Sequence, residues 1–179
     1  MKPFVGILVF GALLATVQGV LGNHLPQAFC PDLGMLLVLA LGLIWRSAAA
    51  GLLLAVLLGY LSDFLSGSLM GQLALLRILV FGAARAVSRQ LSLLGSLPLA
   101  LFSIVITAVH GVALLLLTGL FSLEVPFETP EWMALFPQMV LNAIFVTPMV
   151  AAVRFIAAKL GDDESGRRAL PITAKGFRP

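Results

Sequence analysis

The sequence contains little cysteine, histidine and charge. Among its 179 residues are one cysteine and two histidines, and only 11% of the residues are charged. The lone Cys30 excludes an internal disulfide and a cysteine-rich metal site, and the distance in sequence between His24 and His110 argues against a histidine-based one. The chain also has no glycine-rich phosphate loop of the Walker type, which argues against ATP hydrolysis. We therefore expect no metal and no cofactor.

Hydrophobic residues are abundant instead. They make up 60% of the chain, and the mean hydropathy of +1.09 is far from that of a soluble globular protein. The sequence pI is near 9.6. The basic residues nevertheless lie at the ends of apolar runs rather than in one patch, which argues against nucleic-acid binding. The composition predicts a polytopic membrane protein.

Six apolar runs predict six transmembrane helices in one compact bundle. The runs cover residues 4–22, 33–45, 47–65, 69–84, 97–121 and 132–158. The first run is longer than a usual signal-peptide core and no convincing cleavage site follows it, so we interpret it as a retained span. The second run reaches only roughly 20 Å, which is short for a span.

The segments outside these runs complete the predicted organisation. Residues 85–96 carry two arginines among leucines and serines, and we expect a short amphipathic connection on the internal side. Residues 122–131 contain three glutamates and two prolines, and we expect an acidic external loop. The last run contains two prolines, which predict a kink. The prediction is a single six-helix domain over residues 1–160, followed by a charged cytoplasmic tail over residues 161–179 that is disordered.

Positive charge predicts the orientation in the membrane. In the six-span arrangement, ten of the eleven basic residues fall on one side, and the remaining one, Arg77, lies within a span. The ten are Lys2, Arg46, Arg85, Arg89, Arg154, Lys159, Arg167, Arg168, Lys175 and Arg178. Because cytoplasmic loops carry an excess of lysine and arginine, both termini are predicted to be cytoplasmic.

An acidic residue ends the third run, just before a Ser-Gly-Ser turn. Burying the Asp63 carboxylate in a membrane costs a few kcal/mol even on lenient scales. Gly51, Ala55 and Gly59 precede Asp63 at spacings of four, so the carboxylate lies on the small-residue face of its helix. Small-residue faces are where transmembrane helices pack closely. The pattern therefore predicts that Asp63 points into protein and that Gly67 lies in the turn.

Asp63 and Arg77 together allow two interpretations. In the first, they form an intramembrane ion pair across the hairpin between the third and fourth helices. In the second, Arg77 extends to an interface while Asp63 accepts hydrogen bonds from the backbone of the turn. The sequence does not choose between them.

Polar residues also share faces on the last two helices. Ser103, Thr107 and His110 lie on one face of the fifth helix, and Gln138 and Asn142 are spaced by four on the sixth. A proton relay or ligand site at His110 is one interpretation. We favour interhelical hydrogen bonding for both sets, because it explains the same stripes.

A serine–histidine protease pair is the enzymatic interpretation that we weighed. Ser66 or Ser68 would have to act with His110, but neither serine lies in a nucleophile motif. A turn is the simpler account of both serines. We therefore expect no enzymatic activity.

Two stretches resemble the family of the rod shape-determining protein MreD. They are Pro31-Asp32-Leu33, which opens an aliphatic helix, and residues 59–71, which read GYLSDFLSGSLMG. Asp63 and Gly67 match the most distinctive part of the pattern. Arg77 departs from it, because a mid-run arginine is not a feature of that family.

The resemblance implies a fold, a location and partners. It implies a bundle similar to the substrate-binding S components of vitamin transporters, set in the bacterial cytoplasmic membrane. It implies a non-enzymatic scaffold of the cell-elongation machinery, which makes the peptidoglycan of rod-shaped cells. The implied partner is an MreC-like protein, with the RodA–transpeptidase pair and the MreB cytoskeleton nearby. Membrane lipid is the remaining expected contact.

The implied fold also supplies an alternative function, which is capture of a small nutrient such as a vitamin. That function needs convergent polar and aromatic groups near the external face. The predicted external loops offer mainly His24, Gln27, Trp132 and three glutamates, and the chain has one tyrosine. We favour the scaffold because small-residue faces suit helix–helix association.

Overall fold

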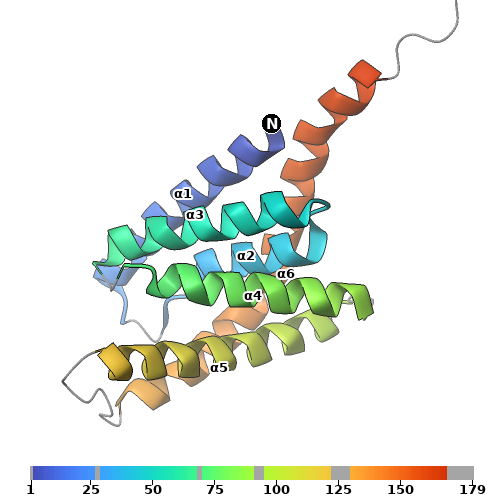
Figure 1. The fold of residues 1–179 in the computed structure, drawn as a ribbon. Helices are drawn as coiled ribbons and strands as arrows, with labels where there is room; N and C mark the ends of the chain where they lie inside the picture. Colours follow the sequence, from blue (N-terminus) through green and yellow to red (C-terminus); the bar gives the residue numbers. More distant parts are fainter. Residues whose placement is uncertain (1, 27–28, 68–69, 91–94, 122–129, 169–179) are drawn as a thin grey trace, which may run out of the picture.

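The computed structural model describes residues 2–26, 29–67, 70–90, 95–121 and 130–168, which form six helices and no strands (Figure 1). The helices are α1 (Lys2–His24), α2 (Leu33–Ile44), α3 (Ala48–Ser66), α4 (Gln72–Gln90), α5 (Ser96–Phe121) and α6 (Pro130–Arg168). Four helices are long and apolar enough to cross a membrane, namely α1, α3, α5 and the part of α6 from Leu135 to Leu160. The predicted helical membrane bundle is therefore confirmed, but among the described residues only four of the six predicted spans are long and apolar enough to cross a membrane.

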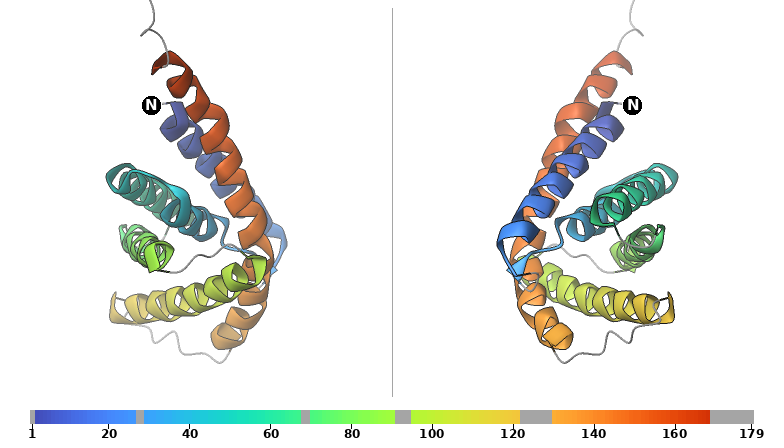
Figure 2. Two further views of the ribbon diagram at one scale, coloured as in Figure 1. Left: turned by 90° about the vertical axis from the view of Figure 1, so that its right-hand side faces the viewer. Right: turned by 90° about the vertical axis from the view of Figure 1, so that its left-hand side faces the viewer.

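Five helices form a ring around the sixth. In the ring, α1 packs against α3, α3 against α4, α4 against α5, α5 against α6, and α6 against α1. The helix α2 lies inside this ring and contacts α1, α3, α4 and α6. The helix α6 packs beside α5 with its first half and beside α1 with its second half (Figures 1 and 2). The core lies where α2 meets its neighbours.

The central helix α2 is both the shortest and the most buried. Its 12 residues span roughly 18 Å, well short of a hydrocarbon core of about 30 Å. Every residue from Met35 to Gly42 is buried. A helix with leucine and valine on all sides needs apolar surroundings on all sides, and the ring supplies them. The short second run is thus explained by enclosure in protein.

Capping side chains and a glycine fix the ends of the helices around the core. The Ser47 hydroxyl accepts a hydrogen bond from the Ala50 N–H at the start of α3. Gly67 ends α3 in the left-handed region with φ of 66°, where a side chain would be strained. The predicted turn at Gly67 is therefore confirmed.

Two segments differ from the prediction. The helix α4 continues through Arg85 and Arg89 to Gln90, so these arginines belong to a helix that packs against α2 and α3. No proline interrupts the chain between Arg77 and Gln90, and the alanines at 83, 84 and 86 favour a helix there. The helix α6 likewise passes through Pro137 and Pro148 and continues to Arg168, into the segment expected to be disordered. Of the predicted acidic loop at 122–131, residues 122–129 lie outside the described residues, whereas residues 130 and 131 belong to the start of α6. The end of the predicted tail, residues 169–179, also lies outside the described residues.

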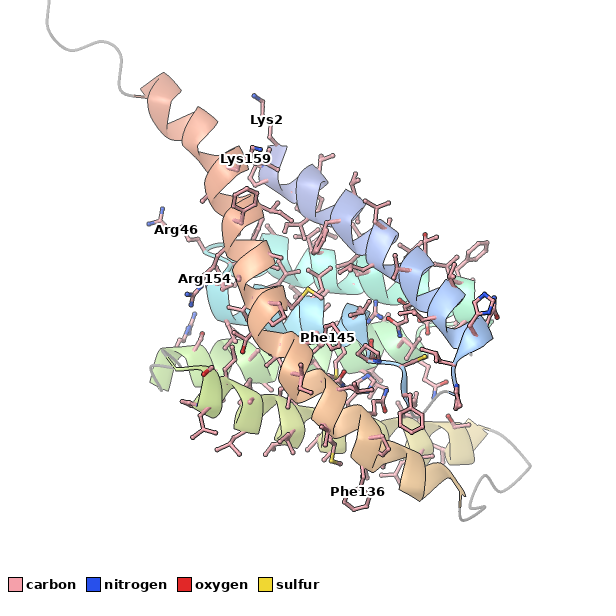
Figure 3. The ribbon with its side chains drawn as sticks, turned by 180° about the vertical axis from the view of Figure 1, so that it is seen from behind. Lys2, Arg46, Phe136, Phe145, Arg154 and Lys159 are labelled. Carbon is pink, nitrogen blue, oxygen red and sulfur yellow. The ribbon has the colours of Figure 1, made fainter. Side chains whose placement is uncertain are left out.

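Basic residues gather at one end of the bundle. Lys2, Arg46, Arg154 and Lys159 lie toward the end that holds the N-terminus, whereas Phe136 lies toward the other end (Figure 3). Arg85 donates hydrogen bonds to the carbonyls of Trp45 and Arg46, which places it at the same end as Arg46. The α3–α4 turn, and with it Asp63, is at the opposite end of its hairpin.

Candidate functional site

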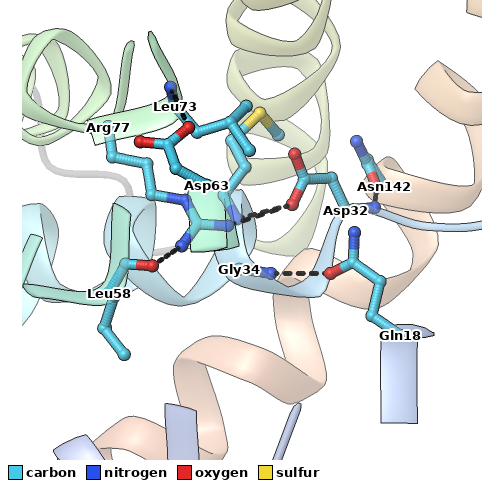
Figure 4. Close-up of polar contacts among 9 residues, drawn as sticks. Gln18, Asp32, Gly34, Leu58, Asp63, Leu73, Arg77 and Asn142 are labelled. Carbon is cyan, nitrogen blue, oxygen red and sulfur yellow. Dashed lines mark hydrogen bonds and ion pairs between the residues drawn. The ribbon is translucent and has the colours of Figure 1, made fainter. Parts of the chain in front are cut away.

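A network of polar groups connects all six helices inside the bundle. We call it the interior polar network, and it comprises Gln18, Asp32, Asp63, Arg77, Thr107 and Asn142. Figure 4 labels all of these residues except Thr107. Asp63, Arg77, Thr107 and Asn142 are each at most 4% exposed. Buried polar groups at this depth are stable only when they are bonded, so each one is a strong constraint on its helix.

Asp63 caps the start of α4 from the end of α3. One carboxylate oxygen accepts hydrogen bonds from the N–H groups of Gly71 at 3.0 Å and Ala74 at 3.2 Å, and the other from Leu73 at 2.8 Å. The first turn of a helix has backbone N–H groups without intrahelical partners and a partial positive charge. The buried carboxylate accepts hydrogen bonds from these N–H groups and offsets the positive charge. Asp63 therefore bonds to the backbone at the turn, as one of the two interpretations of the sequence predicts.

Arg77 joins α4 to α3 and to the start of α2. Its guanidinium donates a hydrogen bond to the Leu58 carbonyl, and its Nη2 lies 3.9 Å from the carboxylate of Asp32. Among the described residues this is the ion pair that Arg77 forms. Arg77 therefore fits neither interpretation in full, since it is buried rather than at an interface and the carboxylate within ion-pair distance of it is that of Asp32.

Gly34 makes room for the arginine. A Cβ at Gly34 would overlap the guanidinium of Arg77, so only glycine permits this close approach. The Gly34 N–H is in turn 3.4 Å from the Oε1 of Gln18, which connects α1 to the start of α2 (Figure 4). Gly34 is the second residue of the apolar helix α2, and nothing in the sequence around it indicates that it makes room for Arg77.

Asp32 is the junction of the interior polar network. Its carboxylate caps α2 by accepting a hydrogen bond from the Met35 N–H at 2.9 Å, while its own N–H donates to the Oδ1 of Asn142 at 3.0 Å. Asn142 also donates through Nδ2 to the Thr107 hydroxyl at 3.1 Å. The role of Asn142 in interhelical hydrogen bonding is confirmed. An aspartate directly before an apolar run is an N-cap signal, but its ion pair with Arg77 could not be found from sequence.

The Ser103, Thr107 and His110 stripe lies in the interior, where Ser103 is fully buried and His110 is 8% exposed. The Thr107 hydroxyl donates to the Ser103 carbonyl at 2.8 Å, within its own helix. The Ser103 hydroxyl and the Nε2 of His110 are buried and have no hydrogen-bond partner in the described part of the chain. Only Thr107 therefore takes part in the predicted interhelical bonding.

The small-residue face of α3 packs against α4. A Cβ at Gly59 would overlap the backbone of Ala74, and one at Gly51 would lie 2.7 Å from the ring of Phe81. Ala55, between them, is fully buried. The face that leads to Asp63 is thus used inside the chain and is not free to receive another protein.

The network has the chemistry of a structural junction. Within the described residues no group of three or more histidine, cysteine or acidic side chains is placed to hold a metal ion. Its charged atoms are bonded to backbone groups and to one another across helix boundaries. Comparison of the chain with protein-family models, with curated proteins and with solved structures finds no match.

Proposed function

We propose that this protein is a non-enzymatic adaptor of the bacterial cytoplasmic membrane that helps to hold the cell-elongation machinery together. The resemblance around Asp63 and Gly67 motivates the proposal. The observation that supports it best is the contrast between an interior held by the polar network and a first helix that is mostly uncovered. In the most apolar window of α1, 11% of the residues are buried, against 28–33% in the other three candidate spans.

The uncovered side of α1 has the features of a helix-binding surface. Within the helix only Ile7 and Gly11 are buried. Val9, Leu13, Val17 and Val20 are about half exposed or more and are spaced as one helical stripe. A Cβ at Gly19 would meet nothing within 4 Å. An open glycine beside an apolar stripe allows a second transmembrane helix to approach the backbone closely.

The proposed partner is an MreC-like protein that docks its single transmembrane helix on this side of α1. The RodA–transpeptidase pair and the MreB cytoskeleton would then associate through the assembled complex. The proposed orientation has both termini in the cytoplasm, and the collection of basic side chains at one end of the bundle supports it (Figure 3).

Substitution of Gly19 by leucine tests the docking. The added side chain fills open space in the isolated chain but overlaps an approaching helix, a cost of about 1–3 kcal/mol, or about 5- to 150-fold in affinity. Copurification of the MreC-like protein from native membranes should fall by that factor. The Gly82→Leu variant is the control, because Gly82 is also open but lies on α4.

Depletion of the protein in its rod-shaped host tests the function itself. We expect rods to become rounded cells. Cells that keep their shape, together with a purified protein that carries a stoichiometric small molecule, would contradict the adaptor and support nutrient capture instead.

A further inference from the structure

A groove lies between the start of α3 and the end of α4. It has a volume of about 470 Å³, within the usual range of small-molecule sites. We call it the α3–α4 groove, and it is lined mainly by Ala49, Leu52, Phe81, Gly82, Arg85 and Arg89. Most of this lining is apolar, and its two polar side chains are both arginines from the last turns of α4.

Gly82 leaves the middle of the groove open. A Cβ at this position would meet no atom within 4 Å. On either side, Leu52 is 40% exposed, while Phe81 is buried and packs against Gly51. The groove therefore has a firm base in the core and a side that faces outward, toward the acyl chains in a membrane protein.

The two arginines give the groove a positive charge that no carboxylate of the described residues pairs with. Arg85 is held in place by hydrogen bonds to the carbonyls of Trp45 and Arg46 at the end of α2. Its Nε is buried and has no hydrogen-bond partner among the residues that the structure describes, and Arg89 is exposed. In the described part of the chain neither arginine forms an ion pair with a carboxylate. Arg77, at the other end of α4, has such a partner.

We propose that the α3–α4 groove binds one anionic phospholipid, with an acyl chain against Leu52, Gly82 and Phe81 and the phosphate at Arg85 and Arg89. The groove is apolar along its length and positively charged at one end. An anionic phospholipid has matching parts, because its acyl chain is apolar and its headgroup is negatively charged. Lys2, Arg46, Arg154 and Lys159 lie toward the same end of the bundle, where basic side chains favour contact with a negatively charged membrane surface (Figure 3). The proposal does not depend on the protein partner.

The probe is dioleoyl phosphatidylglycerol, with dioleoyl phosphatidylcholine as the zwitterionic reference of the same acyl chains. The purified full-length protein is mixed with each lipid in detergent, and bound lipid is counted by native mass spectrometry. We expect one phosphatidylglycerol to bind in preference to phosphatidylcholine. A contact between one arginine and an anionic lipid is worth about fivefold in affinity, so Arg89→Gln should reduce the preference by about that factor.

Two matched controls separate the groove from general charge and general apolarity. Arg154→Gln removes the same charge from the exposed face of α6, and Gly19→Leu adds the same side chain to another open glycine. Both should bind phosphatidylglycerol as the original protein does. Gly82→Leu should lose the bound lipid because its side chain occupies the groove.

Specific outcomes would overturn the proposal. If Arg89→Gln and Arg154→Gln reduce binding equally, the lipid is held by net charge alone. If Gly82→Leu retains the lipid as well as Gly19→Leu does, the groove is not the site. If Gly82→Leu instead loses the MreC-like protein and leaves lipid binding intact, the groove receives a protein helix. Retention of the MreC-like protein by Gly82→Leu while lipid is lost would separate this site from the proposed docking on α1.

Discussion

The two ends of the α3–α4 hairpin carry charge in opposite ways. At the turn, Asp63 and Arg77 are buried, and their charges are bonded to backbone groups and to Asp32. At the open end, Arg85 and Arg89 line a groove and have no carboxylate among the described residues. Charges bonded inside the chain stabilise the fold, whereas charges left without a counterion at a surface are available to a ligand.

Replacing an arginine should give the largest difference in the free energy of unfolding between the two ends of the hairpin. Arg77→Met would leave the carboxylate of Asp32 in the interior without its ionic partner and would also break the bond to Leu58. We expect a loss of about 3–5 kcal/mol in the free energy of unfolding, measured by reversible denaturation in mixed micelles. Arg89→Met, at the open end, should change it by about 0.5 kcal/mol or less.

A double-mutant cycle identifies the partner of Arg77. Asp32→Asn combined with Arg77→Met should cost less than the two single changes added together, with a coupling of about 1 kcal/mol or more. The cycle with Asp63→Asn should show a smaller coupling. A larger coupling to Asp63 than to Asp32 would contradict the contacts described above.

Removing a helix cap should give the next largest difference in stability between the two ends. Asp63→Ala leaves the N–H groups of Gly71, Leu73 and Ala74 without their acceptor in a buried place, and we expect a loss of about 3 kcal/mol. Ser47→Ala removes an exposed cap at the start of α3, where water can replace the hydroxyl, so about 0.5 kcal/mol is expected. Equal losses in chemical denaturation would show that burial of the Asp63 cap adds nothing.

Glycine replacement should show the smallest difference. Gly59→Leu forces α3 away from the backbone of Ala74, and overpacking of this kind costs about 1–3 kcal/mol. Gly82→Leu projects into the open groove and should change stability by about 0.5 kcal/mol or less. Thermal unfolding in detergent compares the two variants directly. If Gly59→Leu is as stable as Gly82→Leu, the close packing of α3 on α4 is not required.

The sequence by itself determined that six segments are helical and which face of α3 is buried, although not where α4 and α6 end. Long apolar runs report helices in a membrane protein because the backbone has no other way to satisfy its polar groups in lipid. The spacing of Gly51, Ala55 and Gly59 likewise placed Asp63 in the interior, since positions four apart share one face of a helix whatever lies opposite.

Only the tertiary structure decided what the buried charges contact. Asp32 and Arg77 are 45 residues apart, and they meet because α2 lies at the centre of the ring and Gly34 leaves space for the guanidinium. No local pattern encodes that meeting. The same is true of Arg85, whose place beside the end of α2 depends on α4 continuing past Arg77 to Gln90. The spacing of residues along a helix predicts which face each side chain occupies. Which residue that side chain contacts depends on which helix the fold packs against that face.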